Sequence, residues 1–288
     1  MQILANGLLA GSIYALVAVG FAIIYSTGKF FHFAHGAVYS VAAYVAYYFV
    51  VYLHFAVVAA IGLAMIFACV LGALVQTVVY RPLSRRGGTS LALLLASLGV
   101  ATLLQNIIPL VFGDAPKSFG SVATEGISLW SARLTCLQVI TMATSMVVCA
   151  TVAIAWHRTS IGRIAQAVAD DRELSIIMGV NVDRVLVIAI GIGSALAGLA
   201  AVLAALDTGI TPSVGMSVLL IAVVGVVIGG VGSVLGAVLG AMLVGLVQST
   251  SAWVLPTQWQ DAAVFLTLIF FLVARPQGII GTDRARKR

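Results

Sequence analysis

Long apolar runs without a charged residue dominate this sequence and decide what it can fold into. An α-helix rises about 1.5 Å per residue, so roughly 20 apolar residues cross the hydrocarbon core of a bilayer, which is about 30 Å thick. Runs of that length and free of charge are residues 3–25, 55–79, 89–112, 134–156 and 185–206, and residues 34–53 also fit. Each of these runs is predicted to be a transmembrane helix.

Composition supports the same fold class. Of the 288 residues, 62% are hydrophobic and only 8% are charged, whereas a soluble domain carries about 25% charged residues. These charges are too few to cover a surface that faces water. A transmembrane barrel is excluded because its strands alternate apolar and polar residues over about 10 positions. We therefore predict an all-α, polytopic helical membrane protein that forms one membrane domain over residues 1–288, with the lipid bilayer as its surroundings.

The C-terminal third contains apolar segments that glycines interrupt. Residues 217–253 are too long for one crossing and are broken by Gly229, Gly230, Gly232 and Ser233. We predict two spans there. Residues 262–274 are short, but Trp259 and Gln260 can extend them at the interface. The total is eight or nine transmembrane helices, eight if one glycine-rich piece is re-entrant.

The basic residues predict the orientation. Thirteen of the 15 lie in segments that share one side of the bilayer, whereas Lys117 in the long loop 113–132 and Arg133 directly after it lie on the other side. By the positive-inside rule, loops 81–88, 157–184 and 275–288 are cytoplasmic. Nine crossings then place the N-terminus outside and the C-terminus inside. The net charge of +6 follows from this pattern, so no nucleic-acid partner is expected. The N-terminus lacks the basic region and cleavage site of a signal peptide.

No enzyme signature is present in the sequence. The phosphate loop G-x-x-x-x-G-K-[ST] is missing, and Gly28-Lys29 lacks both the upstream glycine and the following hydroxyl. His32 and His35 could share a helix face, but a metal site needs more ligands than these two. We expect no catalytic residue, no metal and no cofactor in this chain. The acidic residues all map to loops or span ends, which weighs against a proton- or sodium-coupled carrier. A stand-alone secondary carrier or channel remains the alternative from another class.

The longest cytoplasmic loop, 157–184, is amphipathic. Thr159 or Ser160 can cap a helix that Gly179 would end, and Asn181 or Asp183 can cap the next span. The residues that recur on one helix face are Ile161, Ile164, Ala165, Val168, Ser175 and Ile176. Because the segment carries as many acids as bases and no aromatic residue, it favours docking of a soluble protein. The alternative is a helix lying in the lipid headgroups.

Two glycine-containing breaks are candidates for a translocation path. The first is residues 26–36, STGKFFHFAHG, and the second is residues 229–236, GGVGSVLG. Breaks at matching positions of two halves indicate a substrate path in many transporters. The path candidates are Phe33, His35, Gly36, Gly229, Gly230, Gly232 and Ser233. The alternative is that these glycines allow close helix packing.

At these residues the sequence resembles the LivH-type permease subunits of branched-chain amino-acid ABC importers. The resemblance rests on Asn6-Gly7-Leu8 with Gly11-Ser12-Ile13-Tyr14, on Phe33-Ala34-His35-Gly36 and on the glycine motif at 229–237. It also includes the family's coupling segment, which matches at Gly162, Arg163, Ala167, Ala169, Asp170 and Gly179. The sequence departs from that segment at Ile164 and Gln166, where the family has a small and a basic residue.

The resemblance implies a complete importer in the bacterial inner membrane. Its parts would be a second homologous permease subunit, two cytoplasmic P-loop ATPase subunits that bind ATP and Mg²⁺, and a periplasmic or surface solute-binding protein. The solute would be a branched-chain or other hydrophobic amino acid. Relatives of this type also serve urea, amides and aromatic acids, so those solutes remain alternatives.

Overall fold

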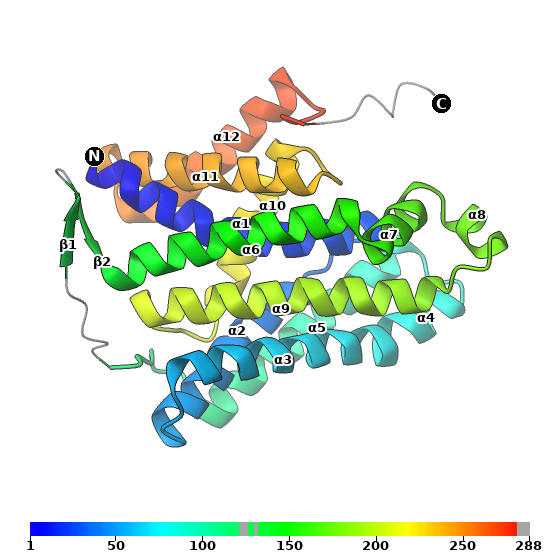
Figure 1. Ribbon diagram of the computed structural model, residues 1–288, viewed down its shortest axis with the longest axis horizontal. Helices are drawn as coiled ribbons and strands as arrows, with labels where there is room; N and C mark the ends of the chain where they lie inside the picture. The colour runs from blue at the N-terminus through cyan, green and yellow to red at the C-terminus, as the bar shows by residue number, and fades with distance from the viewer. Residues whose placement is uncertain (121–125, 130–131, 281–288) are drawn as a thin grey trace.

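The computed structural model describes residues 1–120, 126–129 and 132–280, and within them the chain is a bundle of α-helices (Figure 1). The long helices are α1 (Gln2–Gly28), α2 (Ala34–Tyr47), α3 (Val57–Val75), α5 (Ser90–Phe112), α6 (Cys136–Arg158), α9 (Val182–Thr208), α10 (Val214–Gly229), α11 (Val234–Val254) and α12 (Gln260–Ala274). The π-helical turns η1 (Tyr48–Tyr52) and η2 (Gln76–Tyr80) extend α2 and α3. The short elements are α4 (Arg81–Arg85), α7 (Ser160–Asp170), α8 (Arg172–Ile177), the 3₁₀ turn η3 (Thr257–Trp259) and strands β1 (Gly126–Leu129) and β2 (Ala132–Thr135).

The predicted spans are confirmed as helices. Seven helices in the described residues are long and apolar enough to cross a membrane, and Val214–Gly229 and Gln260–Ala274 are shorter apolar helices. The segment 217–253 is divided as predicted, because α10 ends at Gly229 and α11 begins at Val234. At 1.5 Å per residue the 16 residues of α10 are about 24 Å long.

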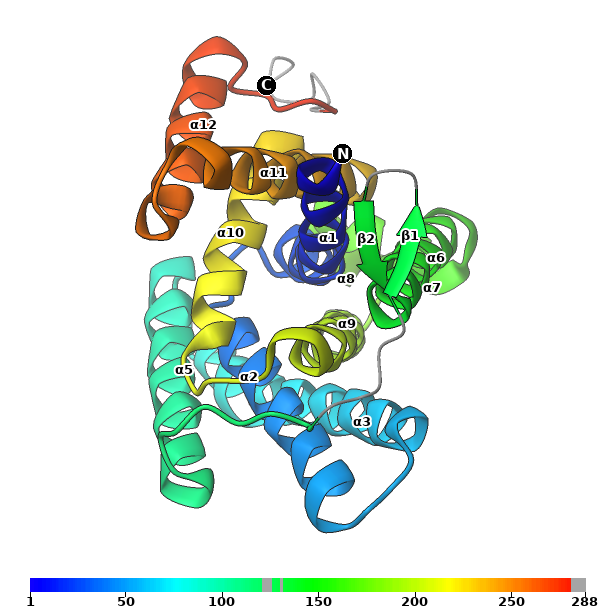
Figure 2. The same cartoon turned by 90° about the vertical axis from the view of Figure 1, so that its left-hand side faces the viewer.

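Helix α1 forms the centre of the bundle. Figure 2 shows it enclosed by α6, α9, α10 and α11, and all four contact it. Its residues from Ala15 to Ile24 are almost fully buried. In contrast, α3, α5 and α6 are exposed along most of their length. Apolar side chains on those outer helices are stable because lipid, rather than water, surrounds them.

Small residues set the distances between the central helices. A Cβ atom on Gly20 would lie 2.7 Å from the carbonyl oxygen of Gly193 in α9, and one on Gly11 would lie 2.9 Å from the Cα of Met242 in α11. Lipid provides no hydrophobic drive for helices to associate, so close van der Waals contact has to provide the attraction.

A non-helical stretch connects α1 to α2 inside the bundle. Lys29 adopts a left-handed conformation with φ of 54°. The chain then turns back along α1, so that the Phe31 ring lies 5.0 Å from that of Tyr25 and 5.9 Å from that of Phe21. Irregular backbone at this depth needs protein partners for its polar groups. Ser97 of α5 provides them, because its hydroxyl accepts from the Phe33 N–H at 3.2 Å and donates to the Phe31 carbonyl at 3.1 Å.

The two ends of the helical bundle differ in their content of basic residues. Figure 1 shows α4, α7 and α8 at one end of the long axis and the N-terminus with strands β1 and β2 at the other. Of the basic residues that the structure describes, Lys117 and Arg133 lie at the strand end, where they contact Ile210 and Gln2. Most of the others lie in or next to α4, α7, α8 and the ends of α6 and α9 that adjoin them: Arg81, Arg85, Arg86, Arg158, Arg163, Arg172 and Arg184. Lys29 lines a pocket together with residues of α7, and Arg275 follows α12. The predicted grouping of loops 81–88 and 157–184 on one side is confirmed. Residues 281–288 of the predicted C-terminal loop lie outside the described residues.

The structure adds one local feature and corrects one local prediction. The end of the predicted loop 113–132 pairs with the following residues in an antiparallel hairpin in which Gly126 is opposite Thr135. The amphipathic segment was predicted as one helix, but it breaks between α7 and α8 at Asp171. The Asp171 carboxylate accepts from the Leu174 N–H at 2.9 Å, so a side chain that competes with the helical backbone ends one helix and caps the next.

Candidate functional site

The predicted coupling segment forms an elbow at the end of α6. The Thr159 hydroxyl caps α7 by accepting from the Gly162 N–H at 3.2 Å. Gly162 packs directly on the backbone of Trp156, and an added Cβ would collide with the Trp156 carbonyl. That carbonyl also accepts from the Gln166 side chain at 2.6 Å. The end of α6 and the first turns of α7 are therefore one rigid unit, which only glycine at position 162 permits.

Helix α7 buries one face and exposes the other. Gly162, Ala165 and Val168 are buried against the bundle. Arg163, Ala167 and Asp170 are exposed on the outer side, and Ala169 is half-buried. Of the predicted coupling residues, Gly162 is therefore structural, whereas Arg163, Ala167 and Asp170 are accessible to a partner. Their role in coupling stays a prediction.

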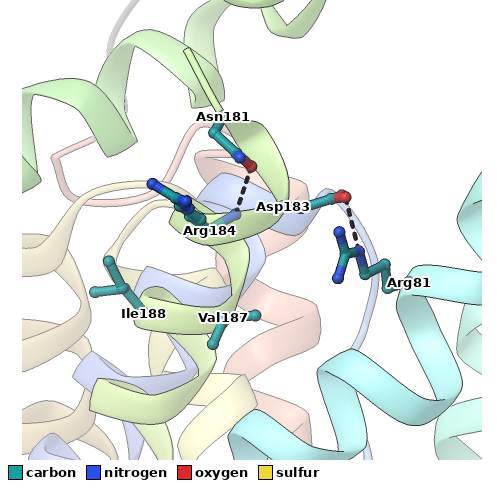
Figure 3. Close-up of a pocket in the computed structure, with 6 residues that line it drawn as sticks. All are labelled: Arg81, Asn181, Asp183, Arg184, Val187 and Ile188. Atoms are coloured by element: carbon teal, nitrogen blue, oxygen red, sulfur yellow. Dashed lines mark hydrogen bonds and ion pairs between the residues drawn. The ribbon is translucent and has the colours of Figure 1, made fainter.

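The return from α8 to α9 follows the predicted signals. Gly179, exposed and with φ of +82°, comes just after the end of α8, and its N–H donates to the Ile176 carbonyl at 2.9 Å. Glycine reaches this left-handed region without the steric cost that other residues incur. Asn181 caps α9 by accepting from the Arg184 N–H at 3.1 Å (Figure 3). Asp183 does not cap the helix and has another role.

Asp183 joins α9 to α4 through two ion pairs. Its Oδ2 atom lies 2.9 Å from Arg81 Nε and 2.8 Å from Arg85 Nη2. Figure 3 shows Arg81 reaching across from the neighbouring helix to Asp183. Sequence reasoning missed this contact because the partners are about 100 positions apart. The pairs connect α4, which continues the outer helix α3 through η2, to the first turn of α9. The predicted coupling segment joins the bundle at that turn.

We expect Asp183→Asn to weaken this connection measurably. The partners are partly exposed, with side-chain exposures of 25% for the aspartate and 40% and 63% for the arginines. Exposed pairs of this kind contribute up to about 1 kcal/mol each, and salt screens them. The thermal unfolding midpoint of the purified variant should fall below wild type at low salt and approach it at high salt. Glu173→Gln, which removes an exposed acid of α8, is the control. Equal midpoints for both variants at all salt concentrations would contradict the role of Asp183.

A polar pocket of about 380 Å³ lies beneath α7 and contains residues from all three sequence motifs. It is lined by Ser26, Lys29, Trp156, His157, Gln166, Ala169, Asp170, Val231, Gly232, Ser233, Val234 and Ile280. The predicted coupling segment and the predicted glycine motif therefore meet at one end of the bundle. Lys29 also lines this pocket. The sequence alone did not indicate that Lys29 belongs to a functional site.

The glycine motif is a tight turn between two closely packed helices. Gly230 and Gly232 have φ of 109° and 94°, which only glycine adopts readily. The Ser233 hydroxyl caps α11 by accepting from the Gly236 N–H at 3.0 Å. A Cβ on Gly229 would collide with the Gly236 carbonyl. Gly229 and Gly230 are buried, Gly232 is exposed and Ser233 is half-buried.

The chain after α12 returns to this turn. The N–H groups of Ile279 and Ile280 donate to the carbonyls of Ile228 and Gly229 at 2.9 Å and 3.0 Å. These carbonyls are at the end of α10, where no helical partner remains for them. The returning segment thus completes the hydrogen bonding of the glycine turn.

The first glycine-containing break reaches this pocket only through Ser26 and Lys29; its predicted path residues Phe33, His35 and Gly36 do not line the pocket. His35 and Gly36 are buried and Phe33 is half-buried. A Cβ on Gly36 would lie 2.7 Å from the Gly215 carbonyl at the start of α10. These contacts match the packing alternative for Gly36 and Gly229. The assignment of the seven candidates to a translocation path stays a prediction.

The two histidines form a buried polar cluster. His32 Nδ1 lies 2.9 Å from the Tyr80 hydroxyl, and the His32 and His35 rings are 6.0 Å apart. Among the residues that the structure describes, no group of three or more His, Cys, Asp or Glu could hold a metal ion.

Comparison with known proteins covers the whole chain. Residues 3–273 match the family described as the permease component of the branched-chain amino acid transport system. The high-affinity branched-chain amino acid transport system permease protein BraD of Pseudomonas aeruginosa is 31% identical over 301 residues, covering 100% of this chain and 97% of BraD. LivH of Salmonella typhimurium, a permease protein of the same description, is 32% identical over 302 residues with the same coverage.

A solved structure shares the fold. PsaBC from Streptococcus pneumoniae in complex with Fab aligns with a TM-score of 0.51 at 14% identity, covering 96% of this chain and 94% of that chain. At this identity the likeness shows the fold alone. The helical bundle, the family match over residues 3–273 and the full-length likeness to BraD and LivH lead to one conclusion: this chain belongs to the family of branched-chain amino acid transport system permease components.

Proposed function

We propose that this chain is the membrane permease subunit of an ATP-driven importer for branched-chain or other hydrophobic amino acids. The observation that carries the proposal is the full-length likeness to permease proteins described as high-affinity branched-chain amino acid transporters. The chain would form half of the translocation path and bind no cofactor itself. ATP and Mg²⁺ would act on separate P-loop subunits, so this chain would not be an enzyme.

The distribution of charge supports an orientation in the bacterial inner membrane. The basic residues gather at the α7 end of the bundle, and cytoplasmic ends of membrane proteins carry the excess of Lys and Arg. We assign the α7 end to the cytoplasm and the hairpin end to the outside. The N-terminus, which lies beside the hairpin, would then be external, and the C-terminal segment would be cytoplasmic.

The partners follow from this orientation. Two cytoplasmic ATPase subunits would dock on the exposed outer face of α7, one on this chain and one on a second homologous permease subunit. A solute-binding protein would deliver the amino acid at the opposite end. The elbow at Gly162 transmits a push on α7 to α6 because the two helices are in rigid backbone contact there. The polar pocket beneath α7 joins that motion to the glycine turn, whose residues remain our candidates for the path.

Co-purification tests the proposal. The tagged chain, extracted in mild detergent from its native host, should retain a P-loop ATPase and a second hydrophobic permease chain, both identified by mass spectrometry. Recovery of the chain alone, together with solute transport by the pure protein in liposomes without ATP, would establish a stand-alone carrier or channel instead.

The variant Arg163→Ala sharpens this test. Arg163 is exposed on the outer face of α7, and its guanidinium donates a long hydrogen bond of 3.5 Å to the Ser160 hydroxyl. The amount of ATPase subunit that co-purifies with the variant should be at least fivefold lower than with wild type. The affinity of the binding protein for its solute should be unchanged. Arg172→Ala, which removes an exposed arginine of α8, is the matched control. Normal ATPase recovery and normal transport in Arg163→Ala would exclude Arg163 from the docking contact.

A further inference from the structure

A groove between α6 and α9, on the side of the elbow away from the polar pocket, has no role in the function proposed above. It is about 340 Å³ in volume and lined almost entirely by apolar side chains of α1, α6, α7 and α9. The lining includes Val152 and Ala155 of α6, Ile161 and Ile164 of α7, and Ile188 and Ile192 of α9. Ile161 and Ile164 are 54% and 41% exposed, so α7 extends apolar side chains over the groove without covering it.

The groove borders a second, cationic pocket at the start of α9, which we call the mouth. This pocket of about 440 Å³ is lined by Arg81, Asn181, Asp183, Arg184, Val187 and Ile188, and Ile188 lines both pockets. Figure 3 shows Arg184 and Ile188 on the same side of α9, one turn apart. The mouth is polar where α9 begins and apolar from Val187 onward.

The mouth carries a net positive charge, and one of its arginines has no acidic partner among the described residues. Asp183 is the acidic residue that lines it, and Arg81 and Arg85 already neutralise its carboxylate. The lining holds Arg81 and Arg184 against Asp183, a net charge of +1, and Arg85 pairs with the same carboxylate from outside the lining. Within the part of the chain that the structure describes, Arg184 bonds to Asn181 through its backbone N–H and its guanidinium forms no hydrogen bond or ion pair, so the guanidinium is available to an anionic ligand. Arginine recognises phosphate groups through paired hydrogen bonds.

The dimensions match one leaflet of a bilayer. From Arg184 to Ile192 the groove follows α9 for about 12 Å, close to the roughly 15 Å that one leaflet contributes to the hydrocarbon core. The phosphate level and the acyl level of a phospholipid would thus coincide with the arginines and with the apolar lining. Anionic lipids bind basic pockets between helices on the cytoplasmic side of membranes, which is the side that the proposed orientation gives to this mouth.

We propose that this groove is a binding site for an anionic phospholipid of the cytoplasmic leaflet, with its phosphate at Arg184 and one acyl chain between α6 and α9 beneath α7. The assignment to the cytoplasmic leaflet rests on the proposed function, but the site itself does not. A lipid there contacts Ile161 and Ile164 of α7, Ala155 of α6 and Ile188 of α9 at once. It therefore supports the elbow from the lipid side and fills the apolar space that α6, α7 and α9 leave between them.

Native mass spectrometry of the purified full-length chain with added lipid tests the proposal. Wild type should bind phosphatidylglycerol at least fivefold more tightly than phosphatidylcholine. The variant Arg184→Gln should lose roughly fivefold in phosphatidylglycerol affinity, the effect of one arginine at a membrane surface, and leave phosphatidylcholine unchanged. The matched control Arg172→Gln should behave as wild type. No preference for phosphatidylglycerol, or the same loss in both variants, would overturn the site.

A second pair of variants tests the acyl groove. Ala155 is exposed and lines the groove, whereas Ala150 is exposed on the same helix and does not line it. Ala155→Phe should weaken the binding of both lipids, and Ala150→Phe should weaken neither. If Ala155→Phe instead disrupts pairing with a second permease chain and leaves lipid binding intact, the groove is a subunit interface and the proposal is wrong. Tight lipid binding by a chain that recruits no ATPase would refute the proposed function and keep the lipid site.

Discussion

Gly229→Leu is expected to remove most of the folded protein from the membrane rather than block transport by an intact protein. A Cβ at this position would collide with the backbone carbonyl of Gly236 in the facing helix. Overpacking a well-packed interior typically costs about 1–3 kcal/mol. The cost here should lie at or above the upper end, because the obstacle is backbone and cannot change rotamer. The yield of monodisperse protein in detergent, by size-exclusion chromatography, should fall at least fivefold.

The control for this prediction is Gly99→Leu. Gly99 lies in α5, and a Cβ there meets no atom within 4 Å. Both variants add the same side chain to a transmembrane helix, so only the contact with another helix differs. A path-lining role for Gly229 predicts normal yield of Gly229→Leu with solute uptake abolished. That result would establish the path assignment and show that α10 and α11 can separate at this point.

Gly162→Ala should have the second largest effect, on coupling rather than on folding. The smallest possible side chain already collides with the Trp156 carbonyl, so α7 would have to tilt away from the end of α6. We expect ATP-dependent solute uptake to fall at least tenfold, while the thermal midpoint of the variant stays near that of wild type. Stability changes little because α7 lies at the end of the bundle and buries few side chains.

Gly62→Ala is the matched control, because a Cβ on Gly62 in α3 meets nothing within 4 Å. Uptake of labelled leucine and the ATPase rate of the assembled complex should be measured together. Loss of uptake with continued ATP hydrolysis would place the defect in the elbow. Uptake at the wild-type rate in Gly162→Ala would show that rigid contact between α6 and α7 is not needed for coupling.

The departure from the family pattern at Gln166 has a structural explanation. The resemblance identified a basic residue as usual at this position, and the structure shows the Gln166 amide donating to the Trp156 carbonyl at 2.6 Å. The same carbonyl faces Gly162. The glutamine thus adds a hydrogen bond to the elbow that the glycine contact already holds.

The sequence by itself determined the fold class and the approximate positions of the apolar helices. A bilayer demands about 20 apolar residues per crossing and leaves no alternative for the backbone, so runs such as residues 89–112 could be assigned from length and hydrophobicity alone. The end of a helix could also be predicted from the sequence where a single nearby residue sets it. Thr159, Gly179 and Asn181 act within a few positions of themselves in the chain, through a cap, a left-handed turn and a second cap.

Only the tertiary structure decided which of these segments meet. The pairing of Asp183 with Arg81, the support of the 29–33 stretch by Ser97 and the closure of the glycine turn by Ile279 join residues 51 or more positions apart. Hydrophobicity does not encode such contacts, because an apolar helix is equally stable in lipid whichever helix it packs against. The partners are selected by shape, through glycines such as Gly36 and Gly229, and by the few polar groups that need each other. A glycine in the sequence looks the same whether it lines a path or admits a neighbouring backbone, and only its surroundings in the folded chain distinguish the two.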